Sequence, residues 1–222
     1  MFFTPSNNIY AVTQTNNIVD SSTALRIESI LKEMNALMAQ KSEENRVKNL
    51  IGESSGERFI PFYSQVLDIS DYKWKGVGCG IVGLAMIIDY YQPSVDINTL
   101  LQQGIETGAY NDTNGWSHAG LINIAQKNGL NGQAVYAVSF DTLVQAVEEG
   151  PVIVSVDYSM TAQNTIPHLI VVTDIKDGVV HYNNPASLSG GETISADNFK
   201  MTWKKNYIEI KPERNFAYKM LK

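Results

Sequence analysis

The single cysteine of the chain, Cys79, lies in a sequence that suits a nucleophile. It stands in Gly-Val-Gly-Cys-Gly, directly before an apolar helix pattern. Flanking glycines permit a tight turn and leave the sulfur open to a substrate. The helix start favours the thiolate, so we expect a thiol pKa below the free value of about 8.5, and the Cys79 N–H can donate to an oxyanion. A lone cysteine is otherwise a small buried hydrophobe, so the motif needs partners.

A nucleophilic cysteine requires a base, and the chain offers His118, His168 and His181. His168 follows Pro167 and opens a β-branched run over residues 169–175. A histidine at the mouth of a central strand is held rigidly and can face a helix start across a cleft. His118 stands at a predicted helix beginning, where a capping or surface histidine is the better interpretation. We therefore predict His168 as the base.

The hairpin after His168 predicts a third member of the site. If all of residues 176–178 form the loop, Ile170 lies opposite Asn184, and Asn184 becomes the diagonal neighbour of His168. An asparagine there accepts the imidazole N–H and orients the ring. A two-residue loop would turn Asn184 to the wrong face. Asn184 would then be a plain turn residue in Asn-Asn-Pro.

The elements that position these residues follow from hydrophobic periodicity. Helices before strands indicate an α+β fold. The sequence predicts helices over 21–50, 80–91, 96–104, 117–128 and 141–149, and strands over 133–138, 152–156, 169–175, 179–182 and 207–210.

A linker pattern over residues 52–56 predicts a boundary, with an N-terminal arm of one long helix over 1–57 and a compact domain over 58–222. The arm carries an apolar stripe that requires a partner surface. We expect it to pack on its own domain, with docking onto another chain or autoinhibition as alternatives. The stripe consists of Leu25, Ile27, Ile30, Leu31, Met34, Leu37 and Met38.

Composition limits the classes of function. Of 222 residues 44% are apolar, enough for a real core, and a net charge of −6 argues against nucleic acid or an anionic membrane. One cysteine excludes an internal disulfide and a multi-cysteine zinc site. The N-terminal residues lack a secretory signal pattern, and the apolar run over 81–88 is too short to span a bilayer, so we expect a soluble chain.

Several motifs in order resemble papain-like cysteine peptidases related to the bacterial peptidases that process bacteriocin leaders at a double glycine. The resemblance covers roughly residues 58–211. It implies a papain-like two-lobed fold, with a helical lobe carrying the nucleophile and an antiparallel sheet lobe carrying the base. It also implies hydrolysis of a peptide substrate without a metal or organic cofactor, and is compatible with export or a place in the cell envelope. The motifs are Ile-Pro-Phe-Tyr-Ser-Gln (60–65), Gly-Cys-Gly (78–80), Leu-Ala-Met (84–86), His-Leu-Ile-Val-Val (168–172) and Tyr-Asn-Asn-Pro (182–185).

The resemblance adds Gln65, which matches the glutamine that donates to the oxyanion; the alternative is an ordinary loop glutamine. Two positions depart from the family pattern, Asn184 where aspartate is common and Ile81 where proline is usual. The leading hypothesis is a cysteine peptidase with a Cys-His-Asn triad. The alternatives are an amidase or acyltransferase acting on non-protein amides, and an idle papain-like module that binds peptide or docks on a larger assembly.

Overall fold

A computed structural model describes residues 21–54, 59–92, 95–160 and 166–212. The contacts of the chain divide it into two units, 1–39 and 40–222. Helix α1, Ser21–Ser54, runs through this division. In the first unit, the apolar side chains of the predicted stripe from Leu25 to Leu37 are 47–66% exposed. Their packing against a partner stays a prediction.

The last turns of α1 belong to the second unit because they bond to it. Asn45 donates from Nδ2 to the Leu188 carbonyl at 3.0 Å. Asn49 donates to the Phe62 carbonyl at 2.9 Å and accepts from the Phe62 N–H at 3.0 Å. The helix continues through the first part of the predicted linker as far as Ser54. Contacts therefore separate the chain at residue 39 and not at residue 57; the rest of the linker lies outside the described residues.

The second unit is built on a six-stranded sheet in which all neighbouring strands are antiparallel. A separate two-stranded sheet pairs β1, Tyr110–Asn111, with β2, Gly115–Trp116. The order of the large sheet is β3 (Leu130–Tyr136), β8 (Trp203–Pro212), β4 (Val152–Asp157), β5 (Pro167–Lys176), β6 (Val179–Asn183) and β7 (Glu192–Ser195).

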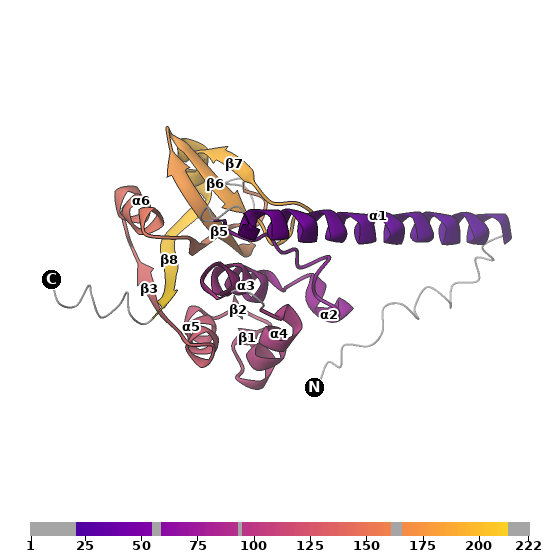
Figure 1. Cartoon of the computed structure of the whole chain (residues 1–222), viewed down its shortest axis with the longest axis horizontal. Helices are drawn as coiled ribbons and strands as arrows, with labels where there is room; N and C mark the ends of the chain where they lie inside the picture. The colour runs from indigo at the N-terminus through magenta and orange to yellow at the C-terminus, as the bar shows by residue number, and fades with distance from the viewer. Residues whose placement is uncertain (1–20, 55–58, 93–94, 161–165, 213–222) are drawn as a thin grey trace. The chain divides into compact units, whose positions relative to one another are not determined.

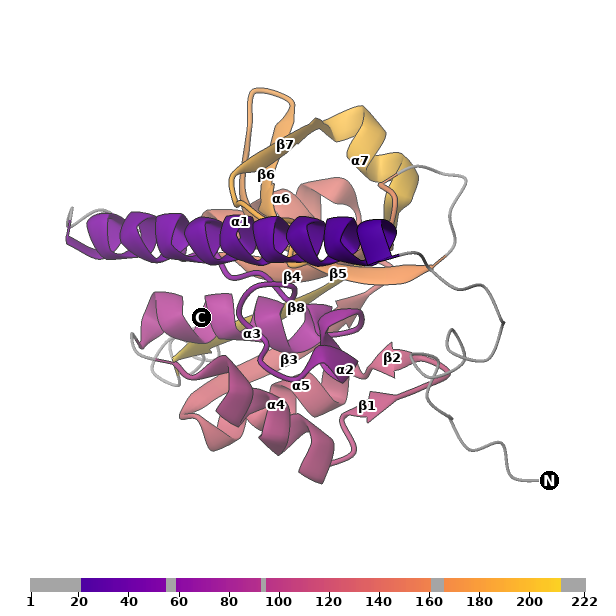
Figure 2. The same cartoon turned by 90° about the vertical axis from the view of Figure 1, so that its right-hand side faces the viewer.

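Helices cover both faces of this sheet, as Figures 1 and 2 show. On one side lie α3 (Cys79–Tyr91), α4 (Ile97–Glu106) and α5 (His118–Lys127), and on the other lie α6 (Phe140–Glu148) and α7 (Ala196–Thr202). A short helix, α2 (Tyr72–Lys75), precedes α3. The predicted α+β papain-like fold is confirmed. The short elements α2, β1, β2, β7 and α7 were not predicted.

Strand β5 explains why its sequence is apolar at consecutive positions. Leu169 and Val171 belong to the core shared with α3, whereas Ile170 and Val172 belong to the core shared with α6 and α7. Successive side chains of a strand point to opposite faces, so a strand covered on both sides must be apolar throughout. Helix α3 is buried on nearly every side for the same reason, since it lies between the sheet and two other helices.

The hairpin between β5 and β6 corrects one prediction and preserves its result. The loop has two residues, Asp177 and Gly178, both with positive φ, and Lys176 pairs with Val179. The predicted three-residue loop is therefore wrong. A β-bulge between Val172 and Asp174 then shifts the register by one residue, and Val171 pairs with Asn183. Continuing that register by one residue brings Asn184 opposite Ile170, as predicted.

Candidate active site

Cys79 is the first residue of α3, and no side chain caps this helix start. The first N–H groups of a helix have no intrahelical acceptors, so they remain available to a ligand beside the sulfur. Both flanking glycines are required by packing. A Cβ on Gly78 would lie 2.2 Å from Ile69 Cδ1, and a Cβ on Gly80 would lie 2.5 Å from Trp116 Cγ. Sequence reasoning assigned these glycines to a tight turn and missed the two neighbours.

Trp116 holds the segment before the cysteine. Its Nε1 donates to the Val77 carbonyl at 2.6 Å, two residues ahead of Cys79. The ring packs against Tyr110 with 5.2 Å between centroids and against Trp74 with 6.0 Å. This aromatic group fixes one wall of the pocket at Cys79.

His168 and Asn184 are in direct contact. His168 is 3% exposed, and its Nε2 lies 2.8 Å from Asn184 Oδ1. The same oxygen accepts the Ala186 N–H at 3.0 Å, so the imidazole must be the donor in the first contact. A proton on Nε2 leaves Nδ1 of the neutral ring as the acceptor. The ring also meets Tyr158 edge-on at a centroid distance of 4.9 Å.

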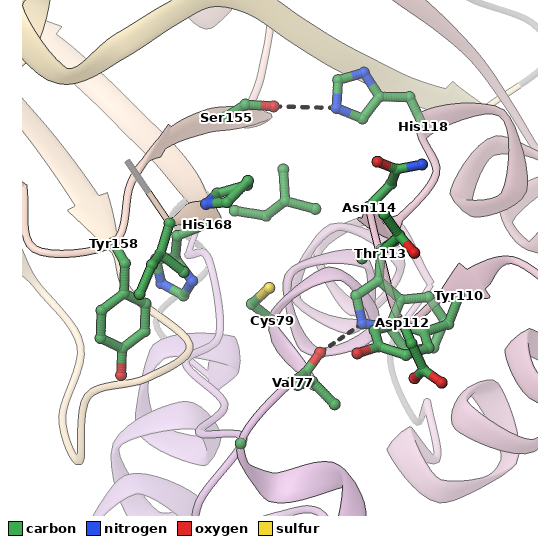
Figure 3. Close-up of a pocket in the computed structure, with 16 residues that line it drawn as sticks. Val77, Cys79, Tyr110, Asp112, Thr113, Asn114, His118, Ser155, Tyr158 and His168 are labelled. Carbon is green, nitrogen blue, oxygen red and sulfur yellow. Dashed lines mark hydrogen bonds between the residues drawn. The ribbon is translucent and has the colours of Figure 1, made fainter. Parts of the chain in front are cut away.

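Cys79 and His168 line the same pocket, which has a volume of about 470 Å³. Figure 3 shows this pocket with Cys79 near its middle, and with His168 and Tyr158 on one side of it. The backbone N–H of Leu169, the residue after His168, hydrogen-bonds to the Cys79 sulfur. The start of β5 therefore lies within hydrogen-bonding reach of the thiol.

Gln65 is buried next to the cysteine loop. Its N–H donates to the Pro185 carbonyl at 2.7 Å, and an added Cβ on Gly78 would lie 3.3 Å from Gln65 Cβ. The side chain is 3% exposed, which excludes an ordinary exposed loop glutamine. Within the described residues its Oε1 has no hydrogen-bond partner. Gln65 is not among the residues that line the 470 Å³ pocket.

His118 corrects a sequence interpretation. It does not cap α5, because Ser117 does so by accepting the Gly120 N–H. It is half-buried and lines the pocket with Cys79. Its Nδ1 lies 3.0 Å from the Tyr136 hydroxyl and its Nε2 lies 3.1 Å from Ser155 Oγ. The available signal was Ser155 itself, a lone hydroxyl in the apolar strand over 152–156.

The third histidine and metal chemistry take no part in this pocket. His181 pairs with Asp174 on β6 and does not line the pocket. Among the described residues, no group of three or more His, Cys, Asp or Glu side chains is placed to hold a metal ion. Of the helices in the described ranges, none has an apolar stretch long enough to cross a membrane.

The Peptidase C39 family matches residues 73–215, which include Cys79, His168 and Asn184. This chain belongs to the C39 family. It is therefore a cysteine-type peptidase, a hydrolase. The matched segment begins after Gln65, so the family match does not extend to that residue. Among curated protein sequences, none matches this chain.

Solved structures of similar fold include other C39 peptidases. The peptidase domain of Streptococcus ComA, a bifunctional ABC transporter of a quorum-sensing pathway, is 20% identical with a TM-score of 0.51, covering 62% of this chain and 93% of its own. A double-glycine-motif protease from an AMS/PCAT transporter, solved with a leader peptide, is 20% identical with a TM-score of 0.51, covering 71% and 94%. A C39-like peptidase from Bacillus anthracis is 18% identical with a TM-score of 0.54, covering 67% and 92%.

The electrostatics of this C39 site favour the neutral forms of both proposed partners. Burial raises the pKa of the Cys79 thiol, although hydrogen bonds from the Leu169, Gly80 and Cys79 amides oppose this effect. Burial lowers the pKa of His168, against the hydrogen bond to Asn184 and the charge of Glu192. The expectation of a lowered thiol pKa is therefore wrong, because desolvation outweighs the helix start.

Proposed function

We propose that this C39 member hydrolyses peptide bonds with Cys79 as nucleophile, His168 as base, Asn184 as the residue that orients the imidazole, and Gln65 as an oxyanion donor. One observation carries the proposal: His168 donates from Nε2 to Asn184 Oδ1 at 2.8 Å while it lines the same pocket as the only cysteine. The contact fixes the ring and its tautomer, and it leaves Nδ1 free to take a proton.

Since burial favours a neutral thiol and a neutral imidazole, proton transfer accompanies the attack. His168 Nδ1 takes the Cys79 proton as the sulfur bonds to the substrate carbonyl carbon, and the carbonyl oxygen becomes an oxyanion. When the oxyanion collapses, the C–N bond breaks and the imidazolium proton passes to the leaving amine. Water, deprotonated by His168, then attacks the thioester, and the carboxylic acid product leaves as the proton returns to the thiol.

The oxyanion is stabilised by donors beside the start of α3. The free N–H groups of the first helical turn, together with the helix dipole, favour negative charge at this position. Gln65 is held against Gly78 and is buried with an unsatisfied amide oxygen. A buried amide with an unused hydrogen-bonding atom is expected where a ligand completes the bonding.

A peptide is the proposed substrate class. The related AMS/PCAT protease was solved with a leader peptide, which supports a peptide in the corresponding cleft here. The amidase and acyltransferase alternatives use the same chemistry, so only the products distinguish them.

The test compares hydrolysis of a mixed peptide library by the wild type and by Cys79→Ala, His168→Ala and Asn184→Ala. Mass spectrometry should detect new amino termini with the wild type alone at full rate. We expect background activity for Cys79→Ala, a loss of roughly 10²–10⁴-fold for His168→Ala, and a smaller loss for Asn184→Ala because it orients rather than reacts. His181→Ala is the matched control, since His181 does not line the pocket.

Two results would count against the proposal. Equal rates for wild type and His168→Ala would remove His168 as the base. A wild type whose Cys79 reacts with a thiol probe but releases no amine from any peptide would exclude peptide hydrolysis and favour another amide substrate.

A further inference from the structure

A polar cluster in the pocket takes no part in the proposed reaction. Ser155 Oγ lies 3.1 Å from His118 Nε2, and His118 Nδ1 lies 3.0 Å from the Tyr136 hydroxyl. The rings of His118 and Tyr136 stack with 5.5 Å between centroids and 14° between planes. Both nitrogens of His118 are therefore engaged, and its ring is fixed from two sides. Figure 3 shows the Ser155–His118 contact on a side of the pocket away from Tyr158 and His168.

The rest of the pocket wall is largely aromatic and aliphatic. Tyr110 and Trp116 come from the β1–β2 hairpin, and Tyr158, Ile166 and Leu169 come from the sheet side. A volume of about 470 Å³ is within the range of roughly 300–1,000 Å³ typical of sites that enclose an organic ligand. A glycine has no side chain to occupy such a space. An aromatic side chain would replace water against these walls and meet other rings edge-on or offset.

Ser155 retains hydrogen-bonding capacity for a ligand. A serine hydroxyl has one donor and two acceptor positions, and the contact with His118 uses one of these three. Burial lowers the pKa of His118, so the imidazole is neutral and adds no net charge here. A neutral donor and acceptor at the end of an apolar pocket matches a hydroxyl-bearing ring better than a carboxylate or an ammonium group.

We infer that the pocket beside Cys79 receives a bulky side chain of the substrate that ends in a hydrogen-bonding group, tyrosine being the clearest case, and that Ser155 recognises this group. His118 is a positioning residue, because it holds the Ser155 hydroxyl and is itself held by Tyr136. This inference rests on the proposed peptide hydrolysis and names the substrate class of the same site.

The first test measures kcat/KM for peptides that differ only in having tyrosine, phenylalanine or glycine at each position around the cleaved bond. The wild type should prefer tyrosine over phenylalanine at one position by roughly 3- to 10-fold, the effect of one hydrogen bond, and reject glycine there more strongly. Ser155→Ala should abolish the tyrosine-to-phenylalanine preference and retain the preference for phenylalanine over glycine. Ser70→Ala makes the same chemical change at an exposed serine outside the pocket, so it should retain both preferences.

The second test does not require turnover. Binding of N-acetyl-tyrosine amide, N-acetyl-phenylalanine amide and N-acetyl-glycine amide is measured on Cys79→Ala and on Cys79→Ala/Ser155→Ala. The tyrosine derivative should bind the first protein most tightly and lose its advantage over phenylalanine in the second. Equal binding of tyrosine and phenylalanine derivatives, or a glycine preference in either test, would overturn the inference. Selective binding without hydrolysis of any peptide would instead refute the proposed function and leave this inference standing.

Discussion

Replacement of Gly80 by alanine should damage the site by displacing Trp116. A Cβ at Gly80 would lie 2.5 Å from Trp116 Cγ and 2.7 Å from its Cβ, closer than nonbonded carbons approach. The near side of this clash is the base of the indole and not a flexible tip. Relief requires movement of Trp116, whose Nε1 bonds to the Val77 carbonyl beside Cys79.

The same helix contains a matched control, Gly83. A Cβ there would lie 3.5 Å from Val171 Cγ2, an ordinary van der Waals contact. Either glycine gains about 1 kcal/mol of helix propensity on becoming alanine. At Gly80, overpacking costs about 1–3 kcal/mol and the lost Trp116 hydrogen bond about 1 kcal/mol more. The net expectation is a loss of roughly 1–3 kcal/mol for Gly80→Ala and a gain of up to about 1 kcal/mol for Gly83→Ala.

Thermal unfolding followed by circular dichroism measures the difference. A chain of this size shifts its Tm by roughly 2–4 °C per kcal/mol, so Gly80→Ala should unfold about 2–12 °C below the wild type. Gly83→Ala should equal or exceed it. The Trp116→Leu background should reduce the cost of Gly80→Ala, because the two positions are in contact. Equal Tm values for the two alanine variants would refute the reasoning, since only the contact with Trp116 distinguishes the two sites.

Three further expectations follow from charges and hydrogen bonds. Because burial raises the pKa of Cys79, less thiolate is present at a given pH, and the pH midpoint of its alkylation by iodoacetamide should lie above that of free cysteine; a lower midpoint would indicate a preformed ion pair. The charge of Glu192 opposes the larger effect of burial on His168, so Glu192→Gln should lower the pKa of that imidazole further, as read from its NMR titration; an unchanged or higher value would contradict this. Lys211 is 5% exposed and pairs with Glu209, which is 2% exposed, so Lys211→Ala should cost about 3–5 kcal/mol in urea unfolding, whereas Lys200→Ala, at an exposed pair, should cost less than about 1 kcal/mol.

The long elements were predictable because their apolar residues repeat at the period of a helix or run without interruption through a buried strand. The contact between His168 and Asn184 was also predicted, although for a partly wrong reason. The loop turned out one residue shorter, and the bulge supplied the missing residue. Bulges depend on tertiary packing rather than on a local pattern, so sequence periodicity does not place them.

The polar side of the pocket was beyond the reach of sequence reasoning. His118 and Ser155 are 37 residues apart, and their contact depends on how α5 lies across the sheet. The same holds for Gly80 and Trp116, whose close approach gives the glycine a different purpose from the one predicted. The direction of the Cys79 pKa shift failed for a related reason, since burial is a property of the assembled fold.

The bulge at Thr173 also has a consequence for how this hairpin tolerates insertions and deletions. Deleting Thr173 alone would carry Asn184 to the opposite face and separate it from His168. Adding one residue to the Asp177-Gly178 turn alone would do the same. The two changes together cancel, because the turn would then contribute the residue that the bulge now contributes. The hairpin thus has two interchangeable places for one extra residue, and relatives that differ in turn length are expected to differ in the bulge as well.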